Sequence, residues 1–206
     1  MKYDLHTHSK YSYDSFLDPE KIIKIAKKNS LNGIAITDHN TIKGGLIALR
    51  ENKDKDFHLI VGAEIKTDFG DILGLFLNEE IKSRNFYEVI DEIKSQDGLS
   101  SLPHPYRQYK FPEKIIDEID VIEAFNARTK KIQNNKAYQL AKKFKKPITA
   151  GSDAHLGFEI GRGMTIVKEN IRESLKNGKT EINGKESNYY LVHGLSVFSE
   201  KIKKIV

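Results

Sequence analysis

The sequence contains no cysteine among its 206 residues. Disulfides and thiolate metal sites are therefore excluded, and any bound metal ion must be held by histidine, carboxylate or amide side chains. No apolar run approaches the roughly 20 residues that cross a bilayer, and the N-terminus lacks the apolar segment of a secretory signal peptide. These absences predict a cytoplasmic protein without a membrane partner.

Linkers rich in proline, glycine or serine are also missing, and the sequence shows no internal repeat. We therefore expect a single domain over residues 1–206, with a core over 1–168 and a C-terminal extension over 178–206. In the extension, "NGKTEINGKESN" predicts a turn-rich loop, and residues 195–206 predict an amphipathic segment on the exterior. This extension either closes over a site or braces the domain.

The net charge of +5 comes from 34 Lys and Arg against 29 Asp and Glu. The lysines are scattered along helix-like segments such as "KIIKIAKKNS" and "LAKKFKK", which favours a solvated surface over a nucleic-acid patch. No stretch alternates aromatic and basic residues as a platform for single strands does. A small phosphorylated partner therefore fits better than a polymer, and the oligomeric state stays open.

Short strand-like runs alternate with helix-like segments along the chain. Helical spacing is clear at Phe86, Val89, Ile90 and Ile93 and again over residues 132–144, and Asp18 before a proline marks a helix start. The strand-like runs are 2–8, 33–39, 58–65, 71–77, 99–105, 120–126, 147–154 and 163–167. This order predicts an α/β fold with a mostly parallel sheet and helices outside it.

The N-terminal run "DLHTHS" places two histidines two residues apart, behind an aspartate. In a strand, Asp4, His6 and His8 would project from one face, because side chains alternate with a period of two. Three polar, metal-competent side chains make a poor core but a good metal site. "GSDAH" repeats the spacing with Asp153 and His155.

Further ionisable residues stand where other strand-like runs end. The ends of parallel strands gather at one rim of an α/β fold, so we expect these residues to meet there. The candidate ligands are His6, His8, Asp14, His39, Glu64, His104, Asp153 and His155. Their number exceeds the about three protein ligands of one catalytic zinc, and their chemistry suits Mn, Fe or Zn. Clustered divalent ions activate a hydroxide and bind a phosphoryl group, which predicts hydrolysis of a phosphate ester.

These residues resemble the four motifs of the PHP (polymerase and histidinol phosphatase) domain family. "DLHTHS" with Asp14 downstream is similar to the first motif, "TDHN" to the second, "HPYR" to the third and "GSDAH" to the fourth. The resemblance spans Met1 to about Val167. It implies a distorted (β/α)7 barrel of the PHP type with a trinuclear metal centre at the C-terminal rim.

The resemblance also implies an assignment of ligands to two or three divalent ions of Mn, Zn or Fe. One ion would be held by His6, His8, Glu64 and Asp153, and a second by Asp14, His39 and His155. A third would share Glu64 and take His104. Asp71 stands where many family members have a histidine, and it is a further candidate ligand of the third ion, whose occupancy or identity depends on this departure. The predicted catalytic residues are His6, His8, His39, Asp153 and His155.

Other residues are expected to support the ions and the substrate. Asp4 and Asp38 are expected to orient ligand histidines. Arginine suits a phosphate because its planar fork donates two parallel hydrogen bonds. The predicted substrate-binding residues are Arg107, Asn126, Arg128 and Arg162. A metal-bound water or His193 is a candidate acid for the leaving group.

The sequence thus predicts a metal-dependent phosphoesterase that hydrolyses a small phosphomonoester, such as histidinol phosphate or a nucleotide, with a metal-activated hydroxide. An alternative is a 5′-3′ or 3′-5′ exonuclease acting on oligonucleotides. A second alternative is a metal-binding barrel whose catalytic role has lapsed, because fold does not imply function. A lapsed barrel should have lost several ligands, whereas this sequence departs from the family pattern only at Asp71.

Overall fold

The structure is a computed structural model that describes residues 1–107, 111 and 113–204. The last two residues of the predicted C-terminal segment, 205 and 206, lie outside the described part. The strands are β1 (Lys2–Asp4), β2 (Gly33–His39), β3 (His58–Thr67), β4 (Gly70–Leu75), β5 (Leu99–Leu102), β6 (Val121–Asn126), β7 (Ile148–Gly151), β8 (Gly163–Ile166) and β9 (Glu181–Gly184).

These strands form one sheet in the order β7-β6-β5-β4-β3-β2-β1-β8-β9. The sheet curls until β8 comes back beside β7, where Thr165 joins the two strands. Its Oγ1 accepts a hydrogen bond from the Ala150 N–H (2.8 Å) and donates one to the Ala150 carbonyl (3.0 Å). The result is the α/β fold with a nearly closed barrel that the sequence predicts.

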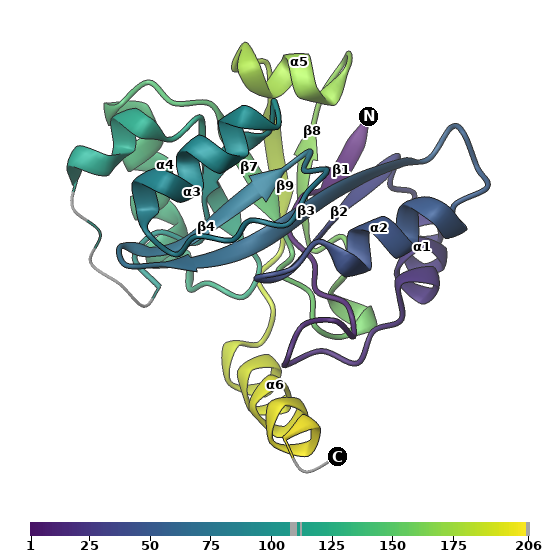
Figure 1. The fold of residues 1–206 in the computed structure, drawn as a ribbon. Coiled ribbons are helices and arrows are strands. Elements are labelled where there is room, and N and C mark those ends of the chain that lie inside the picture. Colours follow the sequence, from purple (N-terminus) through teal and green to yellow (C-terminus); the bar gives the residue numbers. More distant parts are fainter. Residues whose placement is uncertain (108–110, 112, 205–206) are drawn as a thin grey trace.

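Helices surround this barrel (Figure 1). They are α1 (Pro19–Lys28), α2 (Lys43–Glu51), α3 (Phe86–Ser95), α4 (Lys131–Lys143), α5 (Ile171–Lys176) and α6 (Tyr189–Lys203), with 3-10 turns η1 (Glu113–Glu118) and η2 (Gly157–Glu159). In Figure 1, α1 and α2 lie on one side of the sheet and α3 and α4 on the other. Helix α6 projects at the end of the molecule opposite α5.

The predicted helix signals are confirmed by burial and capping. Phe86, Val89, Ile90 and Ile93 of α3 are all buried, because their spacing places them on one helix face. Asp18 caps α1, where its Oδ1 accepts a hydrogen bond from the Glu20 N–H (3.0 Å). These helices cover the outside of the barrel and leave its strand ends free for the site.

The sheet departs from the predicted mostly parallel arrangement. Strand β4 is antiparallel to both β3 and β5, and β8 is antiparallel to both β1 and β9. A tight turn causes the first reversal: Gly70 adopts φ +110°, a conformation open to glycine, and β3 folds directly back as β4. The turn-rich loop predicted after Asn177 was also wrong in part, because β9 forms there and pairs with β8.

The first strand is shorter than predicted. β1 ends at Asp4, and the chain beyond it makes only an isolated parallel bridge between Thr7 and Ala154. His6 and His8 therefore leave the regular ladder and lean toward the segment that follows β7. The simple alternation of side chains in a strand does not extend over Asp4, His6 and His8, and only the two histidines reach a common cluster.

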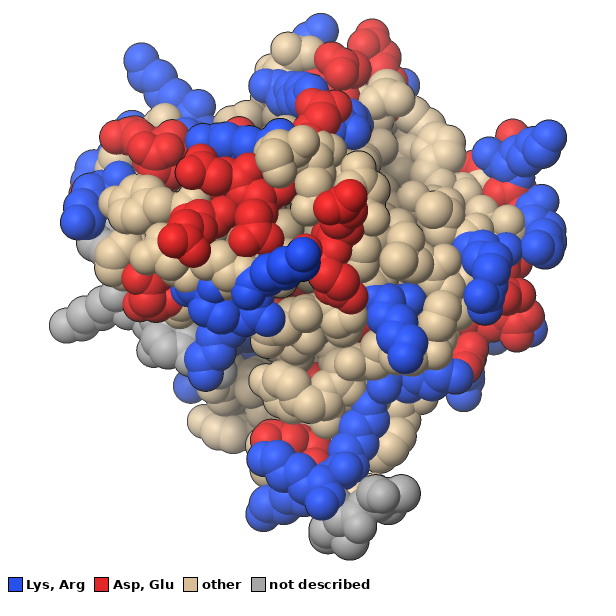
Figure 2. All heavy atoms as spheres, viewed as in Figure 1, with Lys and Arg blue, Asp and Glu red and all other residues tan. Residues whose placement is uncertain are grey.

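Lysine and arginine side chains are dispersed over the face shown in Figure 2, and acidic side chains lie between them. This distribution agrees with the solvated surface that the scattered lysines predict. Among the described residues, no helix has both the length and the apolar character needed to span a bilayer.

Candidate metal centre

Glu64, in β3, lies at the centre of the predicted ligand cluster. Its Oε1 is 2.8 Å from Nε2 of His104, and its Oε2 lies 3.4 Å from Nε2 of both His6 and His8. The same oxygen is 3.3 Å from Nδ1 of His39. One buried carboxylate thus faces four imidazole rings, which is the geometry required of a ligand shared between ions.

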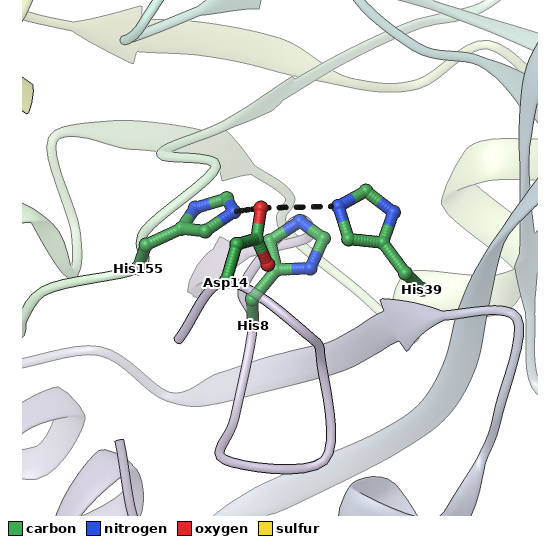
Figure 3. A group of neighbouring side chains, drawn as sticks. All are labelled: His8, Asp14, His39 and His155. Atoms are coloured by element: carbon green, nitrogen blue, oxygen red, sulfur yellow. Dashed lines mark hydrogen bonds and ion pairs between the residues drawn. The ribbon is translucent and has the colours of Figure 1, made fainter. Parts of the chain in front are cut away.

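A second group lies beside it and is shown in Figure 3, where His8, Asp14, His39 and His155 point toward one another. Oδ2 of Asp14 is 2.8 Å from Nε2 of His155 and 3.4 Å from Nε2 of His39. One ligand atom from each of the four residues lies within 4.8 Å of the others. The group contains the three ligands predicted for the second ion and adds His8.

Glu64, Asp71 and His104 make a third group of the same kind. Asp71, in β4, is partly buried, and its carboxylate lies near the ligand atoms of Glu64 and His104. It can therefore serve as a ligand. His104 adopts φ +30°, outside the ordinary regions for a residue with a side chain. Asp153 has φ +55°. Such backbone conformations collect at functional sites, where surrounding contacts hold them in place.

A tight turn after β2 positions His39. Asn40 follows His39 with φ +57°, which ends β2 and redirects the chain into α2. Gly44, at the start of α2, approaches so closely that an added Cβ would lie 2.0 Å from Oδ2 of Asp38 and 2.3 Å from Oγ of Ser9. Only glycine therefore fits at this position.

The donor set fits divalent metal ions. Nε2 of His6 and Nε2 of His8 lie 3.1 Å apart. At this distance the lone pairs of the two nitrogens would repel each other unless a proton or an ion lies between them. Oδ1 of Asp14 is buried and has no hydrogen-bond partner among the described residues. Mixed imidazole and carboxylate donors suit ions such as Mn, Fe and Zn.

Without ions, the ligands differ in protonation. Although burial opposes it, nearby carboxylates raise the pKa of His6 well above its usual range and that of His39 to about 9, so a metal ion would displace a proton from these two rings. Burial lowers the pKa of His8 to about 3, with a further contribution from the charge of His155, so the ring is neutral as metal ligation requires. Burial alone raises the pKa of Glu64, but the charges of His6 and His39 bring it well below its usual range. The carboxylate is therefore ionised despite its burial.

Two residues that support the ligands were not predicted from the sequence. Glu123 of β6 is buried, and its Oε1 lies 3.0 Å from Nδ1 of His6; its Oε2 accepts the His104 N–H (2.7 Å). Oγ of Ser12 lies 3.0 Å from Nδ1 of His8 and accepts the His39 N–H (2.9 Å). Glu123 and Ser12 thereby turn the other ring nitrogen of each histidine toward the cluster.

The predicted roles of Asp4 and Asp38 need correction. Asp4 accepts backbone N–H groups of Ser152 (2.8 Å) and Gly161 (2.8 Å). Asp38 accepts the N–H (2.5 Å) and hydroxyl (2.7 Å) of Ser9. Both carboxylates fix backbone segments that carry ligands, and neither hydrogen-bonds an imidazole ring in the described part of the chain.

Replacing Glu123 by Gln is expected to weaken the metal centre. Glutamine preserves the volume but removes the charge that fixes the His6 ring, and loss of such an outer partner costs about 10–100-fold in metal affinity or activity. Isothermal titration with Mn²⁺ measures the effect. Glu113→Gln, which alters an exposed pair with Lys143, is the matched control. Equal affinities of Glu123→Gln and the control would contradict the assigned role.

Of the four predicted substrate-binding residues, two line the pocket over the ligand cluster and two do not. Arg107 lines the pocket that opens over the ligand cluster. It pairs through Nη1 with Asp153, and its buried Nε has no partner among the described residues. Arg128 also lines the pocket, but its guanidinium is bound by Glu159. Arg107 is thus the arginine best placed to contact a phosphate.

The two remaining candidates are not brought to the pocket. Asn126 is buried and donates from Nδ2 to Glu123 (3.0 Å) and Asp153 (3.3 Å). Arg162 donates from Nη2 to the Glu186 carbonyl (3.1 Å) and does not line the pocket. Asn126 therefore supports the ligand Asp153, and Arg162 serves the attachment of the C-terminal segment.

The pocket that opens over the ligand cluster has a volume of about 200 Å³. Asp14, His39, Glu64, Asp153 and His155 line its floor, and residues of α6 line the opposite side. Fold and ligand cluster together define a nearly closed α/β barrel with a group of candidate metal ligands at one rim.

Comparisons with known proteins identify the family. A family model described as PHP-associated matches residues 131–180. Two uncharacterised proteins of Methanocaldococcus jannaschii are similar to the chain: one is 43% identical over 62% of this chain and 82% of its own length, the other 35% identical over 78% and 68%. The chain belongs to the PHP-domain family.

Solved structures show the same fold. A two-domain protein of Bacteroides vulgatus, described as containing a predicted PHP-like metal-dependent phosphoesterase, matches with a TM-score of 0.77 and 21% identity. The match covers 90% of this chain and 65% of that protein, so the chain spans less than two thirds of its length. The fold is therefore that of the PHP-like barrel.

Two more distant relatives carry functional names. A probable histidinol-phosphatase of Thermotoga maritima is 26% identical over 82% of this chain and 91% of that protein. A 5′-3′ exoribonuclease of Haemophilus influenzae is 40% identical over 33% of this chain and 24% of that protein. The first similarity covers most of both chains, and the second covers only a segment.

Proposed function

We propose that this protein is a metal-dependent phosphomonoesterase that releases inorganic phosphate from a small substrate. The observation that carries the proposal is the convergence of the predicted ligands around Glu64 beneath a pocket that also contains Arg107. Divalent ions bound there would activate water and neutralise the phosphoryl oxygens. The proposed set is two or three ions of Mn, Zn or Fe, held by the predicted ligands including Asp71.

The chain's own residues would bind and orient the phosphate. Arg107 is anchored through Nη1 by Asp153, which leaves its other donors to hydrogen-bond phosphoryl oxygens as a planar fork. Asp153 is in turn fixed by Asn126. This arrangement holds the guanidinium in place before substrate arrives, so little reorganisation is needed during the reaction.

The size of the pocket favours a monomeric ester. Pockets for drug-sized ligands commonly begin at roughly 300 Å³, and this pocket has about 200 Å³. The similarity to a histidinol-phosphatase over most of its length points the same way. Exonuclease action remains a second candidate, because a segment of the chain is similar to an exoribonuclease.

The test is release of inorganic phosphate by protein purified without chelators and supplied with Mn²⁺. The panel contains histidinol phosphate, nucleoside monophosphates, a nucleotide bisphosphate and a 5′-phosphorylated oligonucleotide. We expect release from at least one monomeric ester and its loss in His39→Ala, because that ring belongs to the second ligand group. Release of mononucleotides from the oligonucleotide, without hydrolysis of any monomeric ester, would replace this proposal with the exonuclease.

A further inference from the structure

Helix α6 forms one side of the pocket, although it lies far along the chain from most of the predicted ligands. His193, Ser196, Val197 and Glu200 line the pocket. Their spacing is i, i+3, i+4 and i+7, so they form one continuous face of the helix. The helix therefore presents a complete inward face to the space above the ligand cluster.

A buried ion pair attaches the first half of α6. Arg128 is only 3% exposed, and Nε and Nη2 donate to the two carboxylate oxygens of Glu159 (2.8 and 2.7 Å). Its Nη1 donates to Oγ of Ser196 in α6 (2.8 Å). Oε2 of Glu159 also accepts the His155 N–H (3.2 Å). The same network thus holds both the helix and a predicted metal ligand.

A lysine attaches the other end of the helix. Nζ of Lys203 donates to the backbone carbonyls of Lys10 (2.7 Å) and Ser12. These residues belong to the loop that carries Asp14, and Oγ of Ser12 contacts the His8 ring. Helix α6 is therefore fixed near its middle and at its C-terminal end to segments that hold the cluster, and these polar contacts set its distance from the cluster.

Two of the large apolar residues of α6 point to solvent. Leu191 and Phe198 are 54% and 62% exposed, whereas Val192, Ser196 and Ser199 are buried. A helix that only braced the barrel would bury its largest apolar side chains against it. Here the side facing the barrel carries the polar anchors, and the neighbouring side faces the pocket.

We propose that α6 is the specificity wall of this pocket, and that its inward residues His193 and Val197 limit the leaving group to a small polar alcohol. This inference rests on the proposed phosphomonoesterase function and deepens it. Nδ1 of His193 donates to the Tyr189 carbonyl (2.8 Å), which fixes the ring and leaves Nε2 to meet the leaving group. A second nucleotide attached to the leaving group would collide with the wall.

The test compares two double variants on the same helix. His193→Ala with Val197→Ala opens the wall, and Leu191→Ala with Phe198→Ala removes apolar side chains from the outward face as a matched control. Substrates are glycerol 3-phosphate and a 5′-phosphorylated dinucleotide, assayed with Mn²⁺. Calorimetric binding of a dinucleotide bearing a hydrolysis-resistant 5′-phosphonate gives a readout that does not depend on turnover.

We expect the inward variant to gain at least about tenfold in kcat/KM and in affinity for the dinucleotide compounds, and to show a raised KM for glycerol 3-phosphate. Damage to the fold cannot produce such a gain. Dinucleotide binding and turnover equal to wild type in the inward variant, or an equal gain in the outward variant, would overturn the inference. The two proposals can fail separately. If wild type hydrolyses no ester but the inward variant alone gains affinity for the dinucleotide, the proposed phosphomonoesterase function is wrong and the role of α6 in limiting the pocket is supported.

Discussion

Replacing Glu64 by Gln is expected to reduce kcat/KM for the preferred phosphomonoester by about 10³-fold, since losing metal-derived charge stabilisation costs several kcal/mol in the transition state. Glu64 is 1% exposed and faces His6, His8, His39 and His104. The substitution keeps the shape of the side chain but removes the charge shared between ion sites. Initial rates across a range of Mn²⁺ concentrations measure the effect.

A matched variant separates this effect from a general loss of folded protein. Glu181→Gln changes an exposed glutamate of β9 and should leave the rate within a factor of two. The metal content of both proteins, measured by mass spectrometry of the elements, should fall only in Glu64→Gln. A Glu64→Gln protein with more than a tenth of wild-type kcat/KM would show that Glu64 is not a shared ligand.

Metal loading is expected to raise the melting temperature by about 10 °C. Ligand at 1,000 times its dissociation constant stabilises a folded chain by about 4 kcal/mol, and each kcal/mol is about 2–4 °C for a chain of this size. The physical reason is that bound cations would interact with carboxylates arranged around shared imidazole rings. Glu64 and Asp153 lie 3.4 and 3.2 Å from Nε2 of His8, and Asp14 lies 3.4 Å from Nε2 of His39. Differential scanning fluorimetry with Mn²⁺ and with EDTA measures the shift.

His39→Ala provides the comparison for this prediction, because it removes one ligand from the group in Figure 3. Its melting temperature should respond less to Mn²⁺ than that of wild type, while the values in EDTA stay similar. A shift below about 2 °C in wild type at saturating Mn²⁺ would mean that the cluster does not bind the ion in the folded state.

The ligand cluster could be predicted from the sequence because most of the predicted ligands stand at or near the C-terminal end of a strand-like run. His39 and Glu64 stand on the neighbouring strands β2 and β3, His104 follows β5, and the barrel brings the three residues together. Local rules suffice there, since the C-terminal ends of parallel strands share a rim. The family and the barrel follow from the same motifs, although the antiparallel positions of β4 and β8 do not.

The supporting residues depended on details that the sequence does not encode locally. The register of β6 against β7 shifts between Glu123 and Phe125, so simple alternation fails there. The irregularity lets Nδ2 of Asn126 reach Oε2 of Glu123 at 3.0 Å, three residues apart. A bulge of this kind cannot be read from the letters "VIEAFN".

The placement of α6 depended on contacts between distant residues. Arg128 and Ser196 are 68 positions apart, yet their hydrogen bond sets where the helix lies. The sequence predicts an amphipathic segment on the exterior and leaves open whether it closes over the site. The structure places α6 along the pocket, because its anchors are polar groups whose partners no periodicity reveals.

The central proposal, a multinuclear metal centre that binds a phosphate beside Arg107, is tested most directly by crystallography. Crystals of the Mn²⁺-loaded protein with inorganic phosphate would be measured at the manganese absorption edge. We predict at least two anomalous peaks, one among His6, His8, Glu64 and Asp153 and one among Asp14, His39 and His155, with phosphate between them and Arg107. Well-ordered side chains in this cluster without anomalous peaks, or with phosphate bound only elsewhere, would contradict it.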